Sequence, residues 1–449
     1  MSSMRATAIS LIQRLVEAGH EAVLAGGCVR DQLMGKQPKD YDIATSARPE
    51  EVQRLFPKSF AVGAHFGVIL VRSGEHAFEI ATFRRDGEYV DGRRPESVEF
   101  TDAQEDARRR DFTVNGLFLD PLKDEVLDYV GGRADLEKGV LRAIGNARAR
   151  FQEDQLRLLR AVRFATVLNF EIEPETWAAM KEMAPRIGSV SAERIREELV
   201  RIFLHSNRVR GFDLLVDSGL MAEVLPEILV LKGCEQPPQF HPEGDVFVHT
   251  RIMLGLLPEE VSLSLVLSVL FHDIAKPATF TMDPDGRIRF NGHDKLGAEM
   301  TEEILRRLKF PNDVIEPTVE AVANHMVFKD VKKMRVSKLK RFMARPGFED
   351  EMELHRVDCM SSNGLSDNYE FVREKQAEFG AEPVPLIPKT LINGHDVMEL
   401  GVPAGPALGE MLMAVQNLQL EGELTTREAA LAWVQKNLPA RAPILHSGE

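Results

Sequence analysis

The sequence predicts a multidomain α+β protein with a mixed sheet near its N-terminus and helical domains after it. The chain has 449 residues, which suits roughly three domains of ordinary size. Strand-like apolar runs alternate with helical patterns over the first part, and helical patterns dominate later. We therefore expect a sheet-containing head at 1–145, a helical neck at 146–235, a helical body at 236–375 and a helical tail at 376–449.

Composition narrows the class of protein. Hydrophobic residues make up 44% and charged residues 28%, as in ordinary globular proteins. The N-terminus lacks the apolar core of a signal peptide, and no apolar run approaches about 18 residues, so a cytoplasmic protein with no membrane partner is expected. Cys28, Cys234 and Cys359 lie far apart, which indicates neither a disulfide framework nor a zinc site. The net charge of −14 argues mildly against a nucleic-acid partner, although the distribution of basic residues matters more.

The first candidate site lies in the stretch Leu24–Ala44. An apolar run ends in Gly26-Gly27, a short helix follows, and a second apolar run carries Asp40 and Asp42. Side chains alternate along a strand, so both carboxylates project from one side. Beside a glycine turn with exposed N–H groups, such a pair can hold Mg²⁺ and a triphosphate. Alone, the pattern fits a solvated Asp-x-Asp turn better, but the glycine pair and Arg30 favour the metal site.

The remaining elements of the head complete the predicted sheet. Helices are expected at 8–18 and 46–56, strands at 67–71, 77–83, 117–119 and 126–129, and a further helix beginning at Asp111 or Thr113. Glu79 lies in an apolar strand, where an unpaired carboxylate is costly to bury. It is therefore expected either at an exposed strand edge or, as we favour, beside Asp40 and Asp42 as a third catalytic carboxylate.

Polar and basic segments after these strands suit a triphosphate. Residues 84–95 form either a solvated connection or a mobile flap over a nucleotide site. Arg110 ends a run of three arginines at 108–110, and a guanidinium can donate a bidentate fork to phosphate.

A strongly periodic segment at 147–165 is predicted to form one helix. Asp154 and Arg157 are i,i+3 neighbours on its polar side, and the usual interpretation is a salt pair worth a few tenths of a kcal/mol. A second interpretation is nucleobase recognition, because an Asp acceptor beside an Arg donor complements the pairing edges of cytosine and adenine and mismatches uracil and guanine. Such a site would accept CTP and ATP without a template.

Four motifs in order resemble those of class II tRNA nucleotidyltransferases, the CCA-adding enzymes of the polymerase β-like superfamily. They are Gly26-Gly27-x-x-Arg30-Asp31 with Asp40-x-Asp42, then Arg109–Asn115, then Glu153-Asp154-x-x-Arg157 with Arg160 and Arg163, and finally Ser191–Leu199, the helix that buttresses the third motif. The resemblance spans about residues 20 to 230. It implies Mg²⁺ at Asp40 and Asp42, and nucleotide binding by Gly27, Arg30, Arg110, Asp111, Asp154, Arg157, Arg160 and Arg163. It also implies a monomer or homodimer that acts on tRNA with an immature or damaged 3′ end.

The predicted body contains a second cluster of ligand-type residues. They are His249, His272, Asp273, His293, His325 and Asp358. A lone histidine is more often a core side chain than a ligand, but this order resembles the HD metal-dependent phosphohydrolases, and Lys276 completes His-Asp-x-x-Lys. The resemblance implies a divalent transition metal such as Mn²⁺, Ni²⁺ or Fe²⁺, and hydrolysis of cyclic phosphates or phosphomonoesters. An HD fold kept only as a tRNA scaffold is the alternative.

Residues 329–345 carry eight basic residues and one acidic residue. A charge run is usually a solvated helix face, but in an acidic protein this one is the best candidate for contact with the RNA backbone. The residues expected there are Lys332, Lys333, Lys338, Lys340 and Arg341.

We therefore expect template-independent addition of CCA to the 3′ end of tRNA, with hydrolysis at the HD cluster. An A-adding enzyme, a CC-adding enzyme and a poly(A) polymerase of the same family are the near alternatives, although the acidic composition and the HD cluster argue against the polymerase. Alternatives of other classes are a protein whose main activity is HD phosphohydrolysis and an RNA-binding scaffold with both sites silent.

Overall fold

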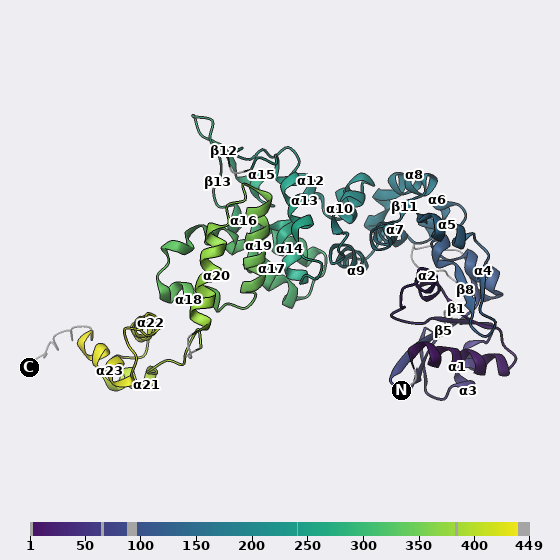
Figure 1. Cartoon of the computed structure of the whole chain (residues 1–449), viewed down its shortest axis with the longest axis horizontal. Helices are drawn as coiled ribbons and strands as arrows, with labels where there is room; N and C mark the ends of the chain where they lie inside the picture. The colour runs from purple at the N-terminus through teal and green to yellow at the C-terminus, as the bar shows by residue number, and fades with distance from the viewer. Residues whose placement is uncertain (1–2, 64–66, 88–96, 240, 382–384, 439–449) are drawn as a thin grey trace, which may run out of the picture. The chain divides into compact units, whose positions relative to one another are not determined.

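The computed structural model describes residues 3–63, 67–87, 97–239, 241–381 and 385–438 (Figure 1). The chain divides into two compact units. The first comprises Met1–Cys234, Leu257–Val266 and Glu303–Pro311, and the second comprises Glu235–Leu256, Leu267–Glu302 and Asn312–Glu449. Among the described residues, no helix combines the length and the apolar character needed to cross a membrane.

A mixed sheet lies at the N-terminal end of the first unit, where Figure 1 labels β1, β5 and β8. It has seven strands in the order β3-β4-β5-β2-β1-β8-β9. Its strands are β1 (Ala22–Ala25), β2 (Ile43–Thr45), β3 (Ser59–Gly63), β4 (Val68–Ser73), β5 (His76–Thr82), β8 (Leu117–Asp120) and β9 (Glu125–Asp128). Strands β2 and β5 are parallel, and the other neighbours are antiparallel. The predicted fold class, a mixed sheet with helices followed by helical regions, is confirmed.

Apolar side chains fill both faces of this sheet because successive residues of a strand point to opposite sides. Leu24 and Ile43 pack into the core that includes Leu15 of α1 (Met4–Glu17). Val23 and Ala44 belong to the opposite core, which includes residues of α4 (Ala103–Arg108). Helices α2 (Gly27–Leu33) and α3 (Pro49–Leu55) complete this part of the unit.

The prediction of a helix beginning at Asp111 or Thr113 is wrong. The chain there makes only the short 3₁₀ turn η2 (Thr113–Asn115), and the preceding helix is α4, which the sequence analysis missed. The Thr113 hydroxyl donates to Asp135 at 2.7 Å, and β8 begins at Leu117. The chain therefore makes a short turn, held by a buried side-chain hydrogen bond, and enters β8 directly, which leaves no room for the expected helix.

The described start of the polar segment at 84–95 forms one strand of a two-stranded ribbon. Strand β6 (Arg84–Asp86) pairs with β7 (Val98–Phe100) in antiparallel register. Residues 88–95 of the predicted flap lie outside the described residues, so the choice between a connection and a flap stays a prediction.

The prediction of a single helix at 147–165 is also wrong, because the chain there forms two helices separated at Asp154. Helix α6 (Ala147–Glu153) ends there, the backbone of Asp154 is extended, and α7 (Leu156–Leu168) follows. The Asp154 carboxylate accepts the N–H of Leu156 at 3.1 Å. Aspartate competes with a continuous helix by bonding nearby backbone N–H groups, which explains a break that apolar periodicity does not reveal.

Helices account for most of the rest of the chain (Figure 1). In the first unit they are α5 (Gly132–Lys138), α8 (Pro174–Met183), α9 (Ala192–Phe203), α10 (Arg208–Asp217), α11 (Leu220–Val224) and α12 (Pro226–Leu229), with the short pair β10 (Val140–Leu141) and β11 (Glu171–Ile172). Later elements are α13 (Val246–Leu256), α14 (Leu263–Phe271), α15 (Lys276–Thr279), β12 (Phe280–Met282), β13 (Ile288–Phe290), α16 (His293–Arg307), α17 (Asn312–Asn324), the 3₁₀ segment η4 (His325–Lys333), α18 (Val336–Met343), α19 (Phe348–Ser361), α20 (Asp367–Gly380), α21 (Gly394–Glu399), α22 (Pro406–Leu420) and α23 (Arg427–Lys436).

Candidate active site and metal centre

Three carboxylates lie on one face of the sheet in the first unit. Ile43 of β2 is in parallel register with Ile80 of β5, so the residues before them, Asp42 and Glu79, lie side by side and project from the same face. Asp40 lies two residues before Asp42, and both are exposed, as is Glu79. The structure therefore brings together the three residues predicted as catalytic carboxylates.

The pKa of Asp42 reflects both its surroundings and the charges of this cluster. Desolvation, followed by repulsion from Asp40 and Glu79, raises the pKa of Asp42 to about 6, while the charge of Arg110 lowers it. Carboxylate oxygens are the ligands that Mg²⁺ prefers, and a divalent cation would relieve this repulsion. The donor set therefore fits the predicted magnesium site.

The turn after β1 brings Arg110 close to these carboxylates. Gly26 precedes α2 with φ of +70°, and a Cβ built there would lie 2.8 Å from Nη1 of Arg110. Glycine is therefore needed at position 26 both for its backbone and for the approach of the guanidinium. Arg110 is fixed by Asp106 at 3.0 Å and by the carbonyl of Asn115 at 3.3 Å. Gly27, a predicted nucleotide-binding residue, is the first residue of α2.

A chain of buried hydrogen bonds joins α2 to α7. Nη1 of Arg30 donates to Oδ1 of Asn115 at 2.6 Å, and Nδ2 of Asn115 donates to Oδ1 of Asp111 at 3.0 Å. Oδ2 of Asp111 accepts two bonds from Arg160, at 2.6 and 2.9 Å. Burial opposes ionisation of Asp111, but Arg160 and the bond from Asn115 outweigh it and hold the pKa of Asp111 at about 2. Asp111 thus links predicted nucleotide-binding residues of the two helices.

The side chains of Asp154 and Arg157 are not paired with each other, although the N–H of Arg157 donates to the carbonyl of Asp154 at 3.0 Å. Nη1 of Arg157 donates to Glu153 at 2.6 Å, and its Nη2 donates to the carbonyl of Arg109 at 3.2 Å. Oδ2 of Asp154 accepts from Arg194 of α9 at 2.9 Å. The intrahelical salt pair that the usual interpretation predicts is therefore wrong, because Asp154 lies in the break and not on the helix with Arg157.

Helix α9 supports α7 from behind. Nε of Arg163 donates to Glu198 of α9 at 2.5 Å, and the guanidinium of Arg163 lies 4.0 Å from the centre of the Phe164 ring. Arg194 of α9 also bonds Asp154, which lies just before α7. Helix α9 therefore fixes one side chain before the start of α7 and one within it.

The six predicted HD ligands come together in the second unit. Asp273 is central: its Oδ2 lies 3.0 Å from Nε2 of His272 and its Oδ1 lies 3.5 Å from Nε2 of His293. Nε2 of His249 lies 3.1 Å from Oδ1 of Asp358. The ligand atoms form two close groups that share Asp273, namely His249, His272 and Asp273, and then Asp273, His293 and His325.

The histidine tautomers are set by the backbone. Nδ1 of His272, His293 and His325 lies 3.0, 2.7 and 2.6 Å from the carbonyl oxygen three residues earlier. Each Nδ1 must therefore carry a proton, and Nε2 is the nitrogen of each ring that lies near Asp273. Burial, followed by the charge of His272, lowers the pKa of His325 to about 4, which keeps that ring neutral.

Two Nε2 atoms of the HD cluster have no hydrogen-bond partner among the described residues. Nε2 of His249 and Nε2 of His272 are buried and make no hydrogen bond within the described part of the chain. Buried polar atoms of this kind call for an explanation such as an ion. Imidazole and carboxylate donors fit a divalent transition metal. Lys276 lies alongside, with Nζ 2.7 Å from Asp273 and 2.6 Å from Oε1 of Gln236.

The predicted RNA-binding run divides into two groups in the structure. Lys332, Lys333 and Lys338 are exposed on η4 and α18. Lys340 lies 4.7 Å from the centre of the Phe379 ring, and Arg341 donates to two side chains of α22, both at 2.9 Å. The second group therefore contributes to packing between helices of the second unit.

Family models match three segments of the chain. Residues 22–142 match a model described as the poly A polymerase head domain. Residues 169–231 match "Probable RNA and SrmB- binding site of polymerase A", and residues 246–359 match the HD domain. The first match contains the three carboxylates, and the third contains the histidine cluster.

Known proteins resemble the chain over almost its whole length. It is 31% identical over 432 residues to the CCA-adding enzyme of Geobacillus stearothermophilus, covering 96% of each chain. It is 32% identical over 428 residues to the CCA-adding enzyme of Lactobacillus gasseri, covering 94% of this chain and 95% of the relative. The chain belongs to the family of CCA-adding enzymes. The predicted resemblance to this family is confirmed.

Solved CCA-adding enzymes share the fold. The crystal structure of the Bacillus stearothermophilus CCA-adding enzyme in complex with CTP superposes with a TM-score of 0.74 at 27% identity, covering 97% of this chain and 98% of that one. The Thermotoga maritima CCA-adding enzyme complexed with tRNA superposes with a TM-score of 0.58 at 19% identity, covering 96% and 95%.

Several residues of these sites were given no role in the sequence analysis. Asn115, Arg194 and Glu198 lie inside quoted motifs of this CCA-adding family member, but only the structure shows what each one contacts. His241 and Glu243 lie beside the HD cluster, in a segment whose proline and glycine residues indicate a turn. The histidine at position 241 was the one available signal.

Proposed function

We propose that this CCA-adding family member adds CMP, CMP and AMP to the 3′ end of tRNA, using CTP and ATP and no template. The observation that carries the proposal is that the carboxylates Asp40, Asp42 and Glu79 lie in the same compact unit as Asp154 and Arg157. This arrangement supports a site for nucleotidyl transfer combined with side chains that select the base. Relatives over nearly the full length are named CCA-adding enzymes.

Asp40 and Asp42, with Glu79 beside them, would hold Mg²⁺ in the first unit. A bound ion would act as a Lewis acid and stabilise negative charge on the α-phosphate and on the departing diphosphate. Arg110, fixed by Asp106, would place a cationic side chain near the phosphates of a bound nucleotide. Gly27 and Arg30 lie at the start and in the middle of α2, the helix that follows the Gly26 turn beside Arg110, and are proposed as further phosphate contacts.

Asp154 and Arg157 would read the pairing edge of the base. Each oxygen of Asp154 has one partner, Arg194 or the N–H of Leu156, and a carboxylate oxygen can accept a further bond. Nε and the second Nη2–H of Arg157 have no partner among the described hydrogen bonds. An amino group and a ring nitrogen of cytosine or adenine complement this pair, whereas uracil and guanine leave polar groups mismatched.

The test is extension of a tRNA that lacks its 3′ end, with Mg²⁺ and with CTP and ATP supplied singly and together. Growth by three nucleotides that then stops supports the proposal. Growth limited to C with both nucleotides present indicates a CC-adding enzyme, a single A added only after CC an A-adding enzyme, and a long A tail a poly(A) polymerase. No extension contradicts all of them.

We further propose that the HD centre hydrolyses cyclic phosphates or phosphomonoesters at RNA ends. The convergence of buried Nε2 atoms on Asp273 favours this second activity over a scaffold. His249, His272, Asp273 and Asp358 would hold one ion, and His293 and His325 would share Asp273 to hold another, with Mn²⁺, Ni²⁺ or Fe²⁺ as the ion. The metal supplies polarisation of the phosphoryl oxygens. The test is release of phosphate from a 2′-nucleotide and opening of a 2′,3′-cyclic nucleotide with each metal, compared with His272→Ala.

Lys332, Lys333 and Lys338 are the proposed tRNA-backbone contacts, with Lys340 and Arg341 as supporting members of the same run. The exposure of the three lysines supports this assignment. Replacing them together with alanine is expected to reduce the salt dependence of tRNA binding, with a loss in log–log slope on the order of one per contact. An unchanged slope would contradict the assignment.

A further inference from the structure

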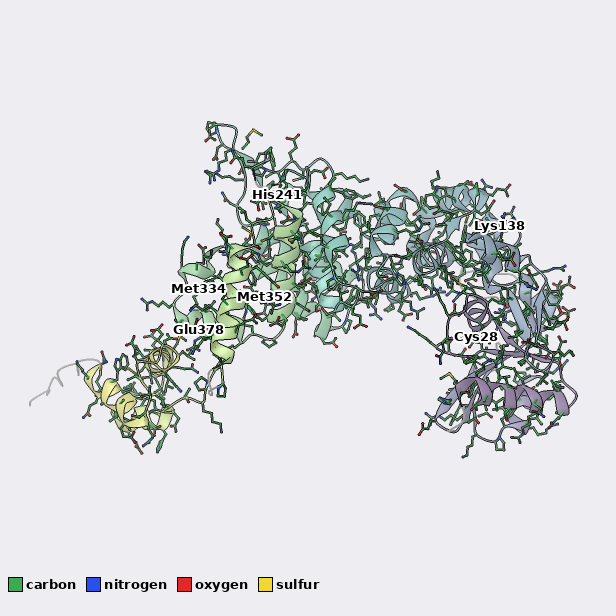
Figure 2. All side chains as sticks on the ribbon, in the orientation of Figure 1. Cys28, Lys138, His241, Met334, Met352 and Glu378 are labelled. Carbon is green, nitrogen blue, oxygen red and sulfur yellow. The ribbon has the colours of Figure 1, made fainter. Side chains whose placement is uncertain are left out.

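A third group of ligand-type side chains touches the HD centre from outside. It consists of His241, Glu243 and His249, whose candidate ligand atoms lie within 4.8 Å of one another. His241, labelled in Figure 2, and Glu243 precede α13 in the second unit, and α13 carries His249. Oε1 of Glu243 lies 2.7 Å from Nδ1 of His249 and 2.9 Å from Nδ1 of His241.

Two serines decide which atom of each contact is the donor. The hydroxyls of Ser361 and Ser362 both donate to the carbonyl of Asp358, at 2.9 and 2.8 Å. Each hydroxyl has a single hydrogen, which is directed at this carbonyl. The Ser361 oxygen lies 3.3 Å from Nδ1 of His249, and the Ser362 oxygen lies 3.3 Å from Nδ1 of His241. In both contacts the serine oxygen can therefore only accept a hydrogen bond. Every polar neighbour of Nδ1 of His249 is then an acceptor, and Nδ1 of that ring must carry a proton.

This assignment excludes a third metal site at the group. A ring that carries its proton on Nδ1 cannot use that nitrogen as a ligand, so His249 faces the HD centre only through Nε2. Nε2 is buried, has no hydrogen bond, and lies 3.1 Å from Oδ1 of Asp358. With Nδ1 already protonated, this short contact is favourable only when a positive charge lies between Nε2 and the carboxylate, either a second proton on the ring or a metal ion.

We propose that Glu243 is a positioning residue of the HD centre, which fixes the tautomer and orientation of His249 so that its Nε2 serves as a metal ligand. His241 occupies the second hydrogen-bonding position of the same Glu243 oxygen and holds the carboxylate in place. Glu243 differs in this from the other histidine supports, because His272, His293 and His325 are oriented by backbone carbonyls. The side chain of Glu243 is nearly buried, and its Oε2 has no hydrogen bond within the described residues. A side-chain carboxylate behind a ligating histidine also raises the basicity of the ring.

The inference rests on the proposed HD metal centre, and its test measures metal binding by the full chain. Co²⁺ is titrated into metal-free wild type, Glu243→Ala and Glu243→Gln, and the visible d–d absorption is recorded. Glu243→Ala removes the acceptor and should weaken Co²⁺ binding roughly 10- to 100-fold with an altered spectrum. Glu243→Gln keeps an amide oxygen for Nδ1–H and should remain within about threefold of wild type.

The matched control is Glu399→Ala, which removes a carboxylate 3.1 Å from His395 in an exposed pair of the same unit and should change nothing. If the wild type binds Co²⁺ and Glu243→Ala binds it with the same affinity, the role of Glu243 is overturned while the metal centre stands. Equal losses in the Gln and Ala variants would also overturn it, because the retained acceptor would then have no effect. A wild-type chain that binds no Co²⁺ would overturn the metal centre itself.

Discussion

The two candidate sites arrange their ligand-type side chains in opposite ways. In the first unit Asp40, Asp42 and Glu79 are exposed and repel one another. In the second unit the histidines and Asp273 are buried, and each ring is oriented by a fixed acceptor behind it. The first site is a set of like charges open to solvent, whereas the second is a buried, preformed cluster of imidazole rings around a carboxylate.

The difference indicates how each site would use its metal. An open cluster of oxygen ligands suits Mg²⁺, which keeps several waters and is usually shared with substrate phosphates. A buried set of imidazoles holds a transition metal more tightly and independently of substrate. The first site is therefore expected to acquire its ion with the nucleotide, and the second to keep a resident ion.

The strongest way to break this comparison is to disable one site at a time. Asp42→Asn should reduce CMP addition on the order of a thousand-fold, because the ion loses a charged ligand needed to stabilise the transition state, and should leave phosphate release unaffected. His272→Ala should abolish phosphate release and leave CMP addition intact. Both activities are measured on the same preparations, with Asp120→Asn as the control, since Asp120 is paired with Lys123 at the end of β8. Loss of both activities in either variant would contradict the separation.

Metal retention separates the two sites next. After loading with Mn²⁺ and gel filtration, the wild type and Asp42→Asn should both retain Mn²⁺, whereas His272→Ala should lose most of it. Elemental analysis of the protein peak measures this. Retention that depends on Asp42 would show that the resident ion belongs to the first unit.

A smaller effect is expected at the proposed base-contacting pair, Asp154 and Arg157. Arg194→Met removes the hydrogen bond that orients Asp154 and should lower the preference for CTP over UTP by about tenfold. This corresponds to about 1.4 kcal/mol of discrimination free energy. The ratio of kcat/KM values for the two nucleotides measures it. Arg201→Met, an exposed change on the same helix, is the control. A loss of activity with an unchanged ratio would show that Arg194 only stabilises the fold.

The raised pKa of Asp42 predicts a pH dependence for the first site. The carboxylate must be ionised to bind Mg²⁺, so at limiting Mg²⁺ the rate of CMP addition should fall about tenfold per unit below pH 6. Saturating Mg²⁺ should move the midpoint lower, because the cation favours the ionised form. Glu79→Gln should move it lower in metal-free titrations by removing one repelling charge. A midpoint insensitive to both changes would contradict the assignment to this cluster.

The smallest expected effect is on stability. Because folding raises the pKa of Asp42, its ionised form is disfavoured in the folded state, and this cost is present above pH 6 and disappears as the pH falls toward 4. Without Mg²⁺, Asp42→Asn should therefore raise Tm slightly, by about 2 °C at pH 8, and not at pH 4. Thermal unfolding followed by circular dichroism measures the difference. An equal rise at both pH values would point to another cause.

Regular patterns made part of this structure predictable. The period of two placed Asp40 and Asp42 on one side, and the cost of burying Glu79 favoured the cluster where the structure places it. The contact between Asp111 and Arg160 spans 49 residues and depends on how a turn meets a helix, which local spacing does not encode. Asp154 was misplaced because apolar periodicity outweighed its capping tendency, and Glu243 was missed because its role comes from hydrogen bonds around a turn.

The interruption at Asp154 has a consequence for how the proposed base-contacting pair is held. The carboxylate of Asp154 is bonded to Arg194 of α9, and its carbonyl accepts the N–H of Arg157 at 3.0 Å. Arg157 lies inside α7, and its guanidinium is bonded to Glu153 at the end of α6. The two side chains therefore lie where α6, α7 and α9 meet, and a substitution in any of these three helices is expected to change their separation.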